Sequence, residues 1–576
     1  MGSAASAGET PHHETLERAL LFLAAIVLLG VGLGLRSPWP ADEPRFALIA
    51  RDMVATGHWF FPEVGAELYA DKPPLFFWMI ASVFWLTGSL RLAFLVPSLI
   101  SALGTLALVY DLGRRWWNHR VGLYAAAILL STVQFLVQAH AAQIDMTLCF
   151  FTTLGLYGMA RHLRSGPSWR WYAAGFAAMG AGIITKGVGF LPLFVLLPWA
   201  WAAWKQWPDV TRERSWKWAL GPVVLVFVVG LWLAPMLATV EAADDPELTA
   251  YRDEILFKQT AGRYASSWDH LRAPWYFVVN VIPPLWLPLS IALPWLLVRW
   301  RRSLKERDLR ILLLCGWALA ILLFFSASPG KRGVYILPAL PAIALAAAPW
   351  LTEIWNRRWV NRAAFVLAAA FVATLAGFAL YAGVLDSARL ERLSQEYGRM
   401  PIGALALAAG IGTIWLLVFR IRRGLVAFAA ILGTAWMILG LIVAPLLDPV
   451  RSGHALMNAL EARLAPGERV GLVGWKEQFL LYFDEPVTVF GHRRFDAHQE
   501  LFDAVSWLER GENRKLFLRD EARSECFSGR GELVGHAHRE DWYLVSRADL
   551  EPQCRGRGSA GAARVYDSPV EHEDLE

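Results

Sequence analysis

Two neighbouring carboxylates, Asp42 and Glu43, follow the first long apolar run of the chain and directly precede a helical pattern. Acidic residues at the start of a helix are commonly caps that complement the exposed amides and the helix dipole. Ionisable groups beside an apolar run of membrane length are costly, however, and are candidates for function by default. The pattern therefore predicts that Asp42 and Glu43 take part in chemistry.

A third carboxylate and a cation stand in comparable positions. Asp145 lies alone between two apolar runs, where the alternative is again a helix cap. Lys72 lies in Asp71-Lys72-Pro73-Pro74, and the two prolines give the following helix a stiff entry. A lysine held at headgroup height beside a helix start suits a phosphate group. The alternative is a lysine that snorkels to anchor the helix.

Further cations lie in loops that we assign to the same side of the membrane. Lys331 and Arg332 follow a tight glycine turn, and Tyr335 opens the next apolar run. Arg263 stands in Gly262-Arg263-Tyr264 of another loop. Loops on the outer side of a membrane carry few cations, so these exceptions need an anionic partner. A phospholipid headgroup is one candidate, and a lipid-linked substrate is the other.

Carboxylates on one wall of a site and cations on another indicate a definite kind of chemistry. The carboxylates would orient or activate a hydroxyl or phosphate nucleophile, and the cations would stabilise a phosphate leaving group. The sequence has no Walker loop before a helix, no dinucleotide fingerprint after a strand and no spaced Cys/His ligand set. An energised donor that dissolves in the membrane, a polyprenyl-phosphate sugar, fits these residues better than a nucleotide. Participation of a divalent metal stays open.

The composition places these residues in a membrane protein. Of the 576 residues, 56% are hydrophobic and 18% are charged, whereas a soluble protein is about 45–50% apolar and about 25% charged. The net charge of +5 does not indicate nucleic acid, because the basic residues form short clusters between apolar runs. That recurrence is typical of the cytoplasmic loops of a multi-spanning protein.

The apolar runs give a count and an orientation. About thirteen runs approach the roughly 20 residues needed to cross the hydrocarbon layer. The run Leu75–Gly88 is shorter, and we interpret it as an amphipathic helix in the membrane interface, which leaves every Arg cluster inside. Residues 1–447 are thus predicted to form an all-α polytopic membrane bundle. Interfacial helices lie in the first outer loop, residues 37–90.

The composition changes beyond Asp448, and strand and helix patterns alternate there. Strands are predicted at 469–473, 487–490, 515–518 and 542–545, and helices at 455–464 and 500–510. Such alternation predicts a small α/β domain over residues 448–554, on the outer side. The stretch 555–576 is rich in Gly, Ala and charge, and we predict that it is disordered.

Two of the four cysteines, Cys526 and Cys554, fall in this predicted domain. An oxidising compartment would permit a disulfide between them. The alternative is two free thiols, because spacing alone does not fix pairing.

The ordered set of these motifs resembles the C-type (GT-C) membrane glycosyltransferases. The branch it is most similar to holds the bacterial aminoarabinose transferases of lipid A and the dolichyl-phosphate-mannose protein mannosyltransferases. The motifs that carry the resemblance are Asp42-Glu43-Pro44-Arg45-Phe46-Ala47, Asp71-Lys72-Pro73-Pro74-Leu75, Asp145, Thr185-Lys186-Gly187 and Gly330-Lys331 with Tyr335-Ile336-Leu337-Pro338. The resemblance implies about thirteen spans, interfacial helices and a trailing periplasmic domain.

The resemblance also implies roles for the site residues. Asp42 is the leading catalytic carboxylate, with Asp145 as the second acidic residue. Lys72, Arg263 and Tyr335 would contact the phosphate of the donor. Lys331 is a further candidate for the same contact, and Glu43 remains a candidate catalytic residue beside Asp42.

We expect a glycosyltransferase of the bacterial-type inner membrane. It would move a pentose or hexose from a polyprenyl-phosphate donor to an acceptor on the periplasmic side. Lipid A or another envelope glycolipid is the first candidate acceptor, and a protein Ser/Thr hydroxyl is the second. A transporter or flippase of lipid-linked sugar is the alternative of a different class; such proteins bind at the midplane between repeated halves, which this sequence does not display.

Overall fold

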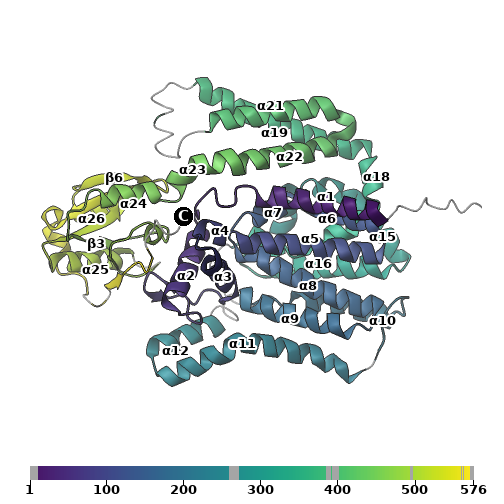
Figure 1. Ribbon diagram of the computed structural model, residues 1–576, viewed down its shortest axis with the longest axis horizontal. Coiled ribbons are helices and arrows are strands. Elements are labelled where there is room, and N and C mark those ends of the chain that lie inside the picture. The colour runs from purple at the N-terminus through teal and green to yellow at the C-terminus, as the bar shows by residue number, and fades with distance from the viewer. Residues whose placement is uncertain are drawn as a thin grey trace, which may run out of the picture.

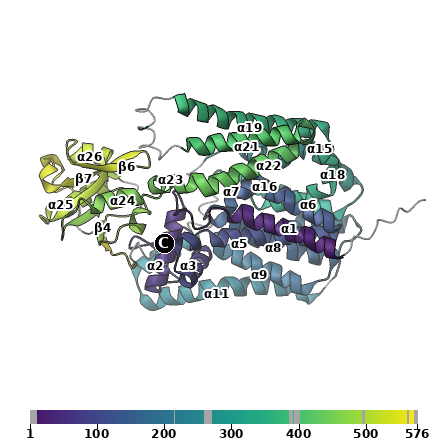
Figure 2. The same cartoon turned by 45° about the horizontal axis from the view of Figure 1, so that its top comes forward.

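The computed structural model describes residues 11–213, 215–257, 271–384, 391, 401–492, 497–559, 561 and 563–570. Most of the chain is a helical bundle, and a six-stranded sheet lies at one end of it (Figures 1 and 2). The helices of the bundle are α1 (Pro11–Gly30), α5 (Val96–Trp116), α6 (His119–Leu130), α7 (Val133–Ala139), α8 (Ile144–Ser165), α9 (Trp169–Lys186), α10 (Leu196–Trp204), α11 (Leu220–Ala243), α14 (Ile282–Leu285), α15 (Leu289–Lys305), α16 (Leu309–Ala327), α17 (Ala339–Ala347), α18 (Leu351–Trp355), α19 (Arg358–Val384), α21 (Ile402–Phe419), α22 (Gly424–Ile438) and α23 (Ala444–Arg451).

Several of these helices can cross a membrane, so the chain is a multi-pass membrane protein. Among the described residues, six helices are long and apolar enough to span the bilayer, or eight if each of two bent pairs counts as one span. The bent pairs are α6 with α7, at 71°, and the helical stretch Phe277–Leu285 with α15, at 116°. Three further apolar helices are shorter, and the count of thirteen spans therefore stays a prediction.

Residues 37–90, which the sequence predicts to be the first outer loop and which keep that name below, fold into three short helices between the bundle and the sheet. They are α2 (Glu43–Thr56), α3 (Leu75–Thr87) and α4 (Leu90–Ala93), with a two-stranded hairpin of β1 (Glu63–Val64) and β2 (Glu67–Leu68) between the first two. Helices α2 and α3 pack through Phe46, whose ring lies 5.7 Å from that of Phe76 and 5.4 Å from that of Phe77. Figure 1 shows this group at the junction of the two parts of the molecule.

The sheet and its helices form a unit that we call the C-terminal domain, residues 454–570. Its strands are β3 (Arg469–Leu472), β4 (Val487–Val489), β5 (Arg514–Arg519), β6 (Glu532–Ala537), β7 (Glu540–Ser546) and β8 (Arg564–Tyr566), in the order β6-β7-β5-β3-β4-β8. Strand β3 is parallel to β4 and β5, and the other pairings are antiparallel. The domain also holds α24 (His454–Glu461), α25 (Ala497–Glu509) and α26 (Asp520–Cys526).

Alternate residues of β5 face two different cores, as the period of a strand requires. Leu516 and Leu518 pack with residues of α25 and with Cys526. Phe517 faces the opposite side, where one continuous core joins the sheet and α24 to α2 and α3. The C-terminal domain and the first outer loop are therefore a single packed body.

The prediction of a disordered tail over 555–576 is wrong for residues 564–566. Residues Arg564–Tyr566 form β8, which pairs antiparallel with β4 and completes one edge of the sheet. The predicted end of the domain at residue 554 is too early for the same reason. Local composition could not reveal this strand, because Tyr566 is buried by contacts with α2, which lies at the other end of the sequence.

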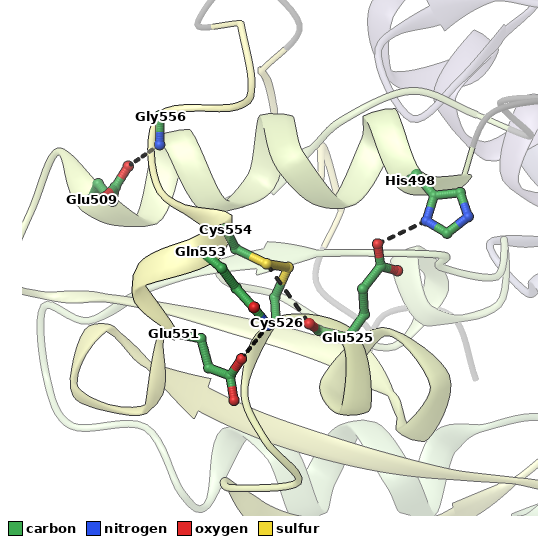
Figure 3. Close-up of a disulfide and its surroundings, with 8 residues drawn as sticks. All are labelled: His498, Glu509, Glu525, Cys526, Glu551, Gln553, Cys554 and Gly556. Carbon is green, nitrogen blue, oxygen red and sulfur yellow. Dashed lines mark hydrogen bonds and ion pairs between the residues drawn. A yellow bond between two sulfur atoms is a disulfide. The ribbon is translucent and has the colours of Figure 1, made fainter.

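A disulfide joins Cys526 at the end of α26 to Cys554, 28 residues later (Figure 3). Helix α25 is attached to both joined segments. His498 near its start contacts Glu525 at 2.8 Å, and Glu509 at its end accepts a hydrogen bond from the backbone N–H of Gly556 at 3.3 Å. The bridge thus fixes the chain that leads from the sheet toward β8.

Candidate active site

Asp42 occupies the residue before α2, but its side chain does not cap the helix. The carboxylate instead faces two cations. One oxygen lies 3.5 Å from Nη1 of Arg45, and the other lies 3.4 Å from Nη2 of Arg332. The side chain of Asp42 is 19% exposed, so it can be reached by a substrate. The simple capping interpretation therefore does not account for this residue.

Glu43 is occupied by structural hydrogen bonds. Its two oxygens accept a bidentate pair from Arg36, at 2.5 and 2.9 Å. They also accept the backbone N–H groups of Trp39, at 2.9 Å, and of Ala142, at 3.0 Å. The guanidinium of Arg36 donates in addition to the carbonyl oxygen of His140, at 2.9 Å. These contacts favour a positioning role for Glu43, which ties the start of α2 to the segment that leads into α8.

Asp145 lies in the first turn of α8 and is buried. One of its oxygens forms an ion pair with Nζ of Lys186, the last residue of α9. The same ammonium lies 4.9 Å from the centre of the Tyr335 ring, a cation–π distance. Asp145 and Lys186 meet because α8 and α9 pack side by side, and Tyr335, which is distant from both in the sequence, lies against the same ammonium.

One short helical turn lies beside the contacts of both carboxylates. This turn, η5 (Gly333–Ile336), carries Tyr335 and begins directly after Arg332. Arg332 contacts Asp42, while Tyr335 faces the ion pair of Asp145. Asp42 and Asp145 are thus arranged around η5, each with a cation beside it. Such an arrangement can orient a nucleophile and stabilise the negative charge of a phosphate leaving group.

Lys331 is buried, and its ammonium is used inside the protein. It donates to the carbonyl oxygens of Arg272, at 3.0 Å, and of Ser328. Burial lowers the pKa of this lysine from its ordinary value. A bridge between Leu271 and Gly330 joins the same two segments. Lys331 therefore secures the loop before η5 to the chain at residues 271–272, and these contacts speak against direct contact with a donor.

Lys72 precedes α3 and is half-buried, and its Nζ donates to the carbonyl oxygen of Asp71 at 2.9 Å. The loop that carries it is attached to α2 through Tyr69. The hydroxyl of Tyr69 lies 3.4 Å from Nη1 of Arg45, and burial raises the pKa of this tyrosine. Lys72 thus follows Tyr69 by three residues, and Tyr69 contacts the guanidinium of Arg45 that faces Asp42.

Arg45 also connects the first outer loop to the C-terminal domain. Its Nε donates to Oε1 of Glu477 at 2.7 Å, and Nε2 of His492 lies 3.2 Å from the same oxygen. Burial by itself would raise the pKa of Glu477. The hydrogen bond with His492 and the ion pair with Arg45 outweigh burial and hold that pKa at about 2. Glu477 is therefore a buried anion at neutral pH.

A second buried contact fixes α2 one and a half turns farther on. Arg51 pairs with Asp52 at 3.0 Å, and the hydroxyl of Tyr566 in β8 donates to Asp52 at 2.9 Å. Arg51 also donates to the carbonyl oxygen of Leu480 at 3.2 Å. Burial raises the pKa of Asp52. Helix α2 is therefore held by buried polar contacts as well as by its apolar core.

Comparisons with known proteins agree with this arrangement. Residues 71–233 match the family described as dolichyl-phosphate-mannose-protein mannosyltransferase. An undecaprenyl phosphate-alpha-4-amino-4-deoxy-L-arabinose arabinosyl transferase of Sodalis glossinidius (strain morsitans) is 31% identical over 336 residues, which are 56% of this chain and 58% of that protein. Another transferase of the same description from that organism is 28% identical and covers 82% of this chain and 86% of its own length. The chain is thus similar to GT-C membrane glycosyltransferases over most of its length.

Solved structures show the same GT-C fold. ArnT from Cupriavidus metallidurans, bound to undecaprenyl phosphate, superposes with a TM-score of 0.69 at 22% identity, covering 95% of this chain and 100% of that one. The oligosaccharyltransferase of Archaeoglobus fulgidus in the apo form gives a TM-score of 0.51 at 13% identity, covering 89% of this chain and 70% of that one. The first curated relative is matched over little more than half of its length.

Two expectations for this site, the role of Arg263 and the participation of a metal, are not covered by these contacts. Arg263 is outside the described residues, as is the rest of the stretch 258–270. Within the part of the chain that the structure describes, no group of three His, Cys, Asp or Glu side chains could hold a metal ion.

Sequence reasoning missed three residues of this GT-C site. Arg45 follows Asp42 by three positions on a helix, and that spacing was a usable signal for the pair. Lys186 stands in a motif that we quoted without giving the lysine a role. Glu477 had no local signal, because its partner lies 432 residues earlier in the chain.

Proposed function

We propose that the protein transfers a sugar from a polyprenyl-phosphate donor to an acceptor on the periplasmic face of the inner membrane. The observation that carries this proposal is the arrangement of Asp42 with Arg332 and of Asp145 with Lys186 around η5. The relatives support the donor, because their description names undecaprenyl phosphate and aminoarabinose. An undecaprenyl-phosphate-linked aminoarabinose or a related sugar is therefore the proposed donor.

In the proposed reaction an oxygen of the acceptor attacks the anomeric carbon of the donor sugar. The bond between that carbon and the phosphate oxygen breaks, and the polyprenyl phosphate leaves with the electron pair. Asp42 orients the acceptor beside the anomeric carbon. Lys72, Tyr335 and Arg263 are the proposed contacts of the donor phosphate, where a cation stabilises the charge that develops on the leaving oxygen.

Lipid A or another envelope glycolipid is the proposed acceptor. A phosphate of such an acceptor is already anionic and needs little deprotonation, so Asp42 would orient it rather than remove a proton. A Ser/Thr hydroxyl of a protein is the second candidate, supported by the mannosyltransferase family match. In that case Asp42 would accept the proton of the hydroxyl as a general base.

The proposed topology has thirteen spans, the site on the outer side and the C-terminal domain in the periplasm. The disulfide between Cys526 and Cys554 supports an oxidising compartment for that domain. Lys331 remains a proposed donor contact only in a state where its bonds to Arg272 and Ser328 are exchanged for the phosphate.

The test is transfer of radiolabelled sugar from polyprenyl phosphate by the purified protein in detergent. Asp42→Asn is expected to abolish transfer while the protein remains folded and inserted. Asp253→Asn is the matched control, because Asp253 is an exposed carboxylate in another outer loop and pairs with Arg252. An active Asp42→Asn variant would remove the assignment of Asp42.

A lipid-linked sugar transporter would move its substrate without forming a covalent product. Transfer of radiolabelled sugar by the purified protein in detergent separates the two functions, because a transporter forms no labelled product there. Loss of one modified lipid species from the membranes of a deletion strain would then identify the product. An unchanged lipid spectrum, together with no labelled product in detergent, would overturn the proposed function.

A further inference from the structure

The guanidinium of Arg45 is shared between two carboxylates from distant parts of the chain. Nε donates to Glu477 at 2.7 Å, while Nη1 lies 3.5 Å from Asp42 and Nη2 donates to the carbonyl oxygen of Ala41 at 3.2 Å. A guanidinium is planar and rigid, so holding one of its edges fixes the direction of the others. The position of Glu477 thus determines how Arg45 faces Asp42.

Asp42 contacts two cations, Arg45 and Arg332, and burial makes the contact with Arg45 the stronger of the two. The side chains of Arg45 and Glu477 are 4% and 9% exposed, whereas that of Arg332 is 45% exposed. Water screens an exposed ion pair. Removing the partner of a buried cation, by contrast, strongly destabilises the folded protein. The orientation of Asp42 therefore depends mainly on Arg45.

Glu477 is itself fixed by the C-terminal domain. His492 lies against its carboxylate, and the ring of His492 packs on Trp475 with 5.1 Å between the ring centres. The backbone N–H of His492 donates to Oε2 of Glu67 at 3.0 Å, which attaches the same segment to the hairpin of the first outer loop. The oxygen of Glu477 that accepts from Arg45 is thus also held by His492 of the C-terminal domain.

We propose that Glu477 is a positioning residue for sugar transfer. It holds Arg45 in the orientation that aligns Asp42, and its charge offsets that of the buried guanidinium. The C-terminal domain would then supply a necessary part of the reaction centre. This inference rests on the proposed function.

Attachment of the domain alone does not account for this geometry. The contacts of Arg51, Asp52 and Tyr566 and the shared apolar core already join α2 to the sheet. Docking of the C-terminal domain on α2 requires no contact with Asp42 or with the carbonyl group of Ala41. Arg45 nevertheless contacts both groups. The Glu477 contact is directed at the start of α2, where the candidate catalytic carboxylate stands.

The test compares Glu477→Gln with Glu477→Asp and with Glu468→Gln in the full-length protein. Glu468 is the matched control, because it forms an ion pair of 2.7 Å with Lys515 inside the same domain. The measurements are kcat and KM for the polyprenyl-phosphate sugar across the pH range, and the melting temperature of each variant in detergent.

We expect Glu477→Gln to lower kcat about 10- to 100-fold with little change in the KM for the donor, because the defect lies in alignment. Glu477→Asp should recover most of kcat, and Glu468→Gln should behave as wild type.

The possible outcomes separate the inference from the proposed function. If wild type and Glu468→Gln transfer sugar and Glu477→Gln keeps the wild-type kcat, the inference is overturned and the proposed function stands. If wild type transfers no sugar, both fail. If Glu477→Gln does not fold, His492→Asn decides, since it keeps the charge but loosens the carboxylate; a folded His492→Asn variant with wild-type kcat would overturn the inference.

Discussion

Glu43 and Arg36 form a two-pronged ion pair, with N–O distances of 2.5 and 2.9 Å, at the point where the first helix of the chain leads into the outer loop. The side chains are 9% and 11% exposed. Because Glu43 also accepts the backbone N–H of Ala142, the pair sets the distance between the start of α2 and the segment that leads to Asp145. Two candidate catalytic carboxylates are thus spaced by a residue that stands next to one of them in the sequence.

Glu43→Ala is expected to lower the free energy of unfolding by roughly 3–5 kcal/mol, because it leaves the buried guanidinium of Arg36 without its partner. Sugar transfer should fall with it. Thermal unfolding in detergent measures the first effect. Glu353→Ala is the control, since Glu353 pairs with Arg299 at an exposed site and should cost less than about 1 kcal/mol. Equal melting temperatures for the two variants would contradict the clamping role of Glu43.

The ion pair of Asp145 and Lys186 is expected to show strong coupling. Its side chains are 9% and 16% exposed, so Asp145→Asn or Lys186→Met alone leaves one charge without its partner. The double variant should be more stable than the sum of the single effects predicts. Transfer should stay lost in all three variants, because the pair faces Tyr335. Recovery of transfer in the double variant would show that the pair is only structural.

Stability should depend on pH through Glu477. Its pKa is held at about 2 in the folded protein, against an ordinary value of 4.5. A carboxyl whose folded-state pKa is lowered contributes stability above its unfolded pKa, and this contribution is lost as the pH falls from 4.5 toward 2. The full contribution is on the order of 3 kcal/mol.

The measurement for this prediction is the melting temperature of wild type and of Glu477→Gln between about pH 7 and pH 3. Wild type should be the more stable protein at neutral pH, and the difference should shrink as the pH is lowered. A difference that is constant over the whole range would show that Glu477 is not held as an anion.

The disulfide should stabilise the C-terminal domain by roughly 3–4 kcal/mol, given the 28 residues that it encloses. The double variant Cys526→Ser/Cys554→Ser is expected to melt at lower temperature than wild type and to be insensitive to a reductant. Cys315→Ser is the control for the reductant, because Cys315 is a free cysteine in α16. A wild-type melting temperature that does not change on reduction would contradict this prediction.

The sequence was sufficient for features that depend on local patterns. The helix after Asp42, the helix from Leu75 and the strands at β3, β4, β5 and β7 follow from apolar periodicity and proline positions, and the structure contains them. The resemblance to the GT-C proteins rested on short motifs, and the comparisons confirm it.

The features that escaped the sequence depend on contacts between distant segments. Glu477 gives no local sign that it will hold Arg45, and Tyr566 gives none that it will pair with Asp52. The number of spans is hard to fix for a related reason, because prolines and short helices break several apolar runs. Burial of this kind is decided by the assembled fold.

The bond between Tyr566 and Asp52 has a consequence for how the protein matures. The two residues are separated by 514 positions, so α2 is synthesised long before the strand that completes its surroundings. Until then the Arg51–Asp52 pair lacks its phenol partner, and the helix must stay hydrated or be sheltered by another molecule. The ribosome would have synthesised all the helices of the bundle before Tyr566 could bond to Asp52. An incomplete chain would therefore lack the finished surroundings of α2, the helix that follows Asp42.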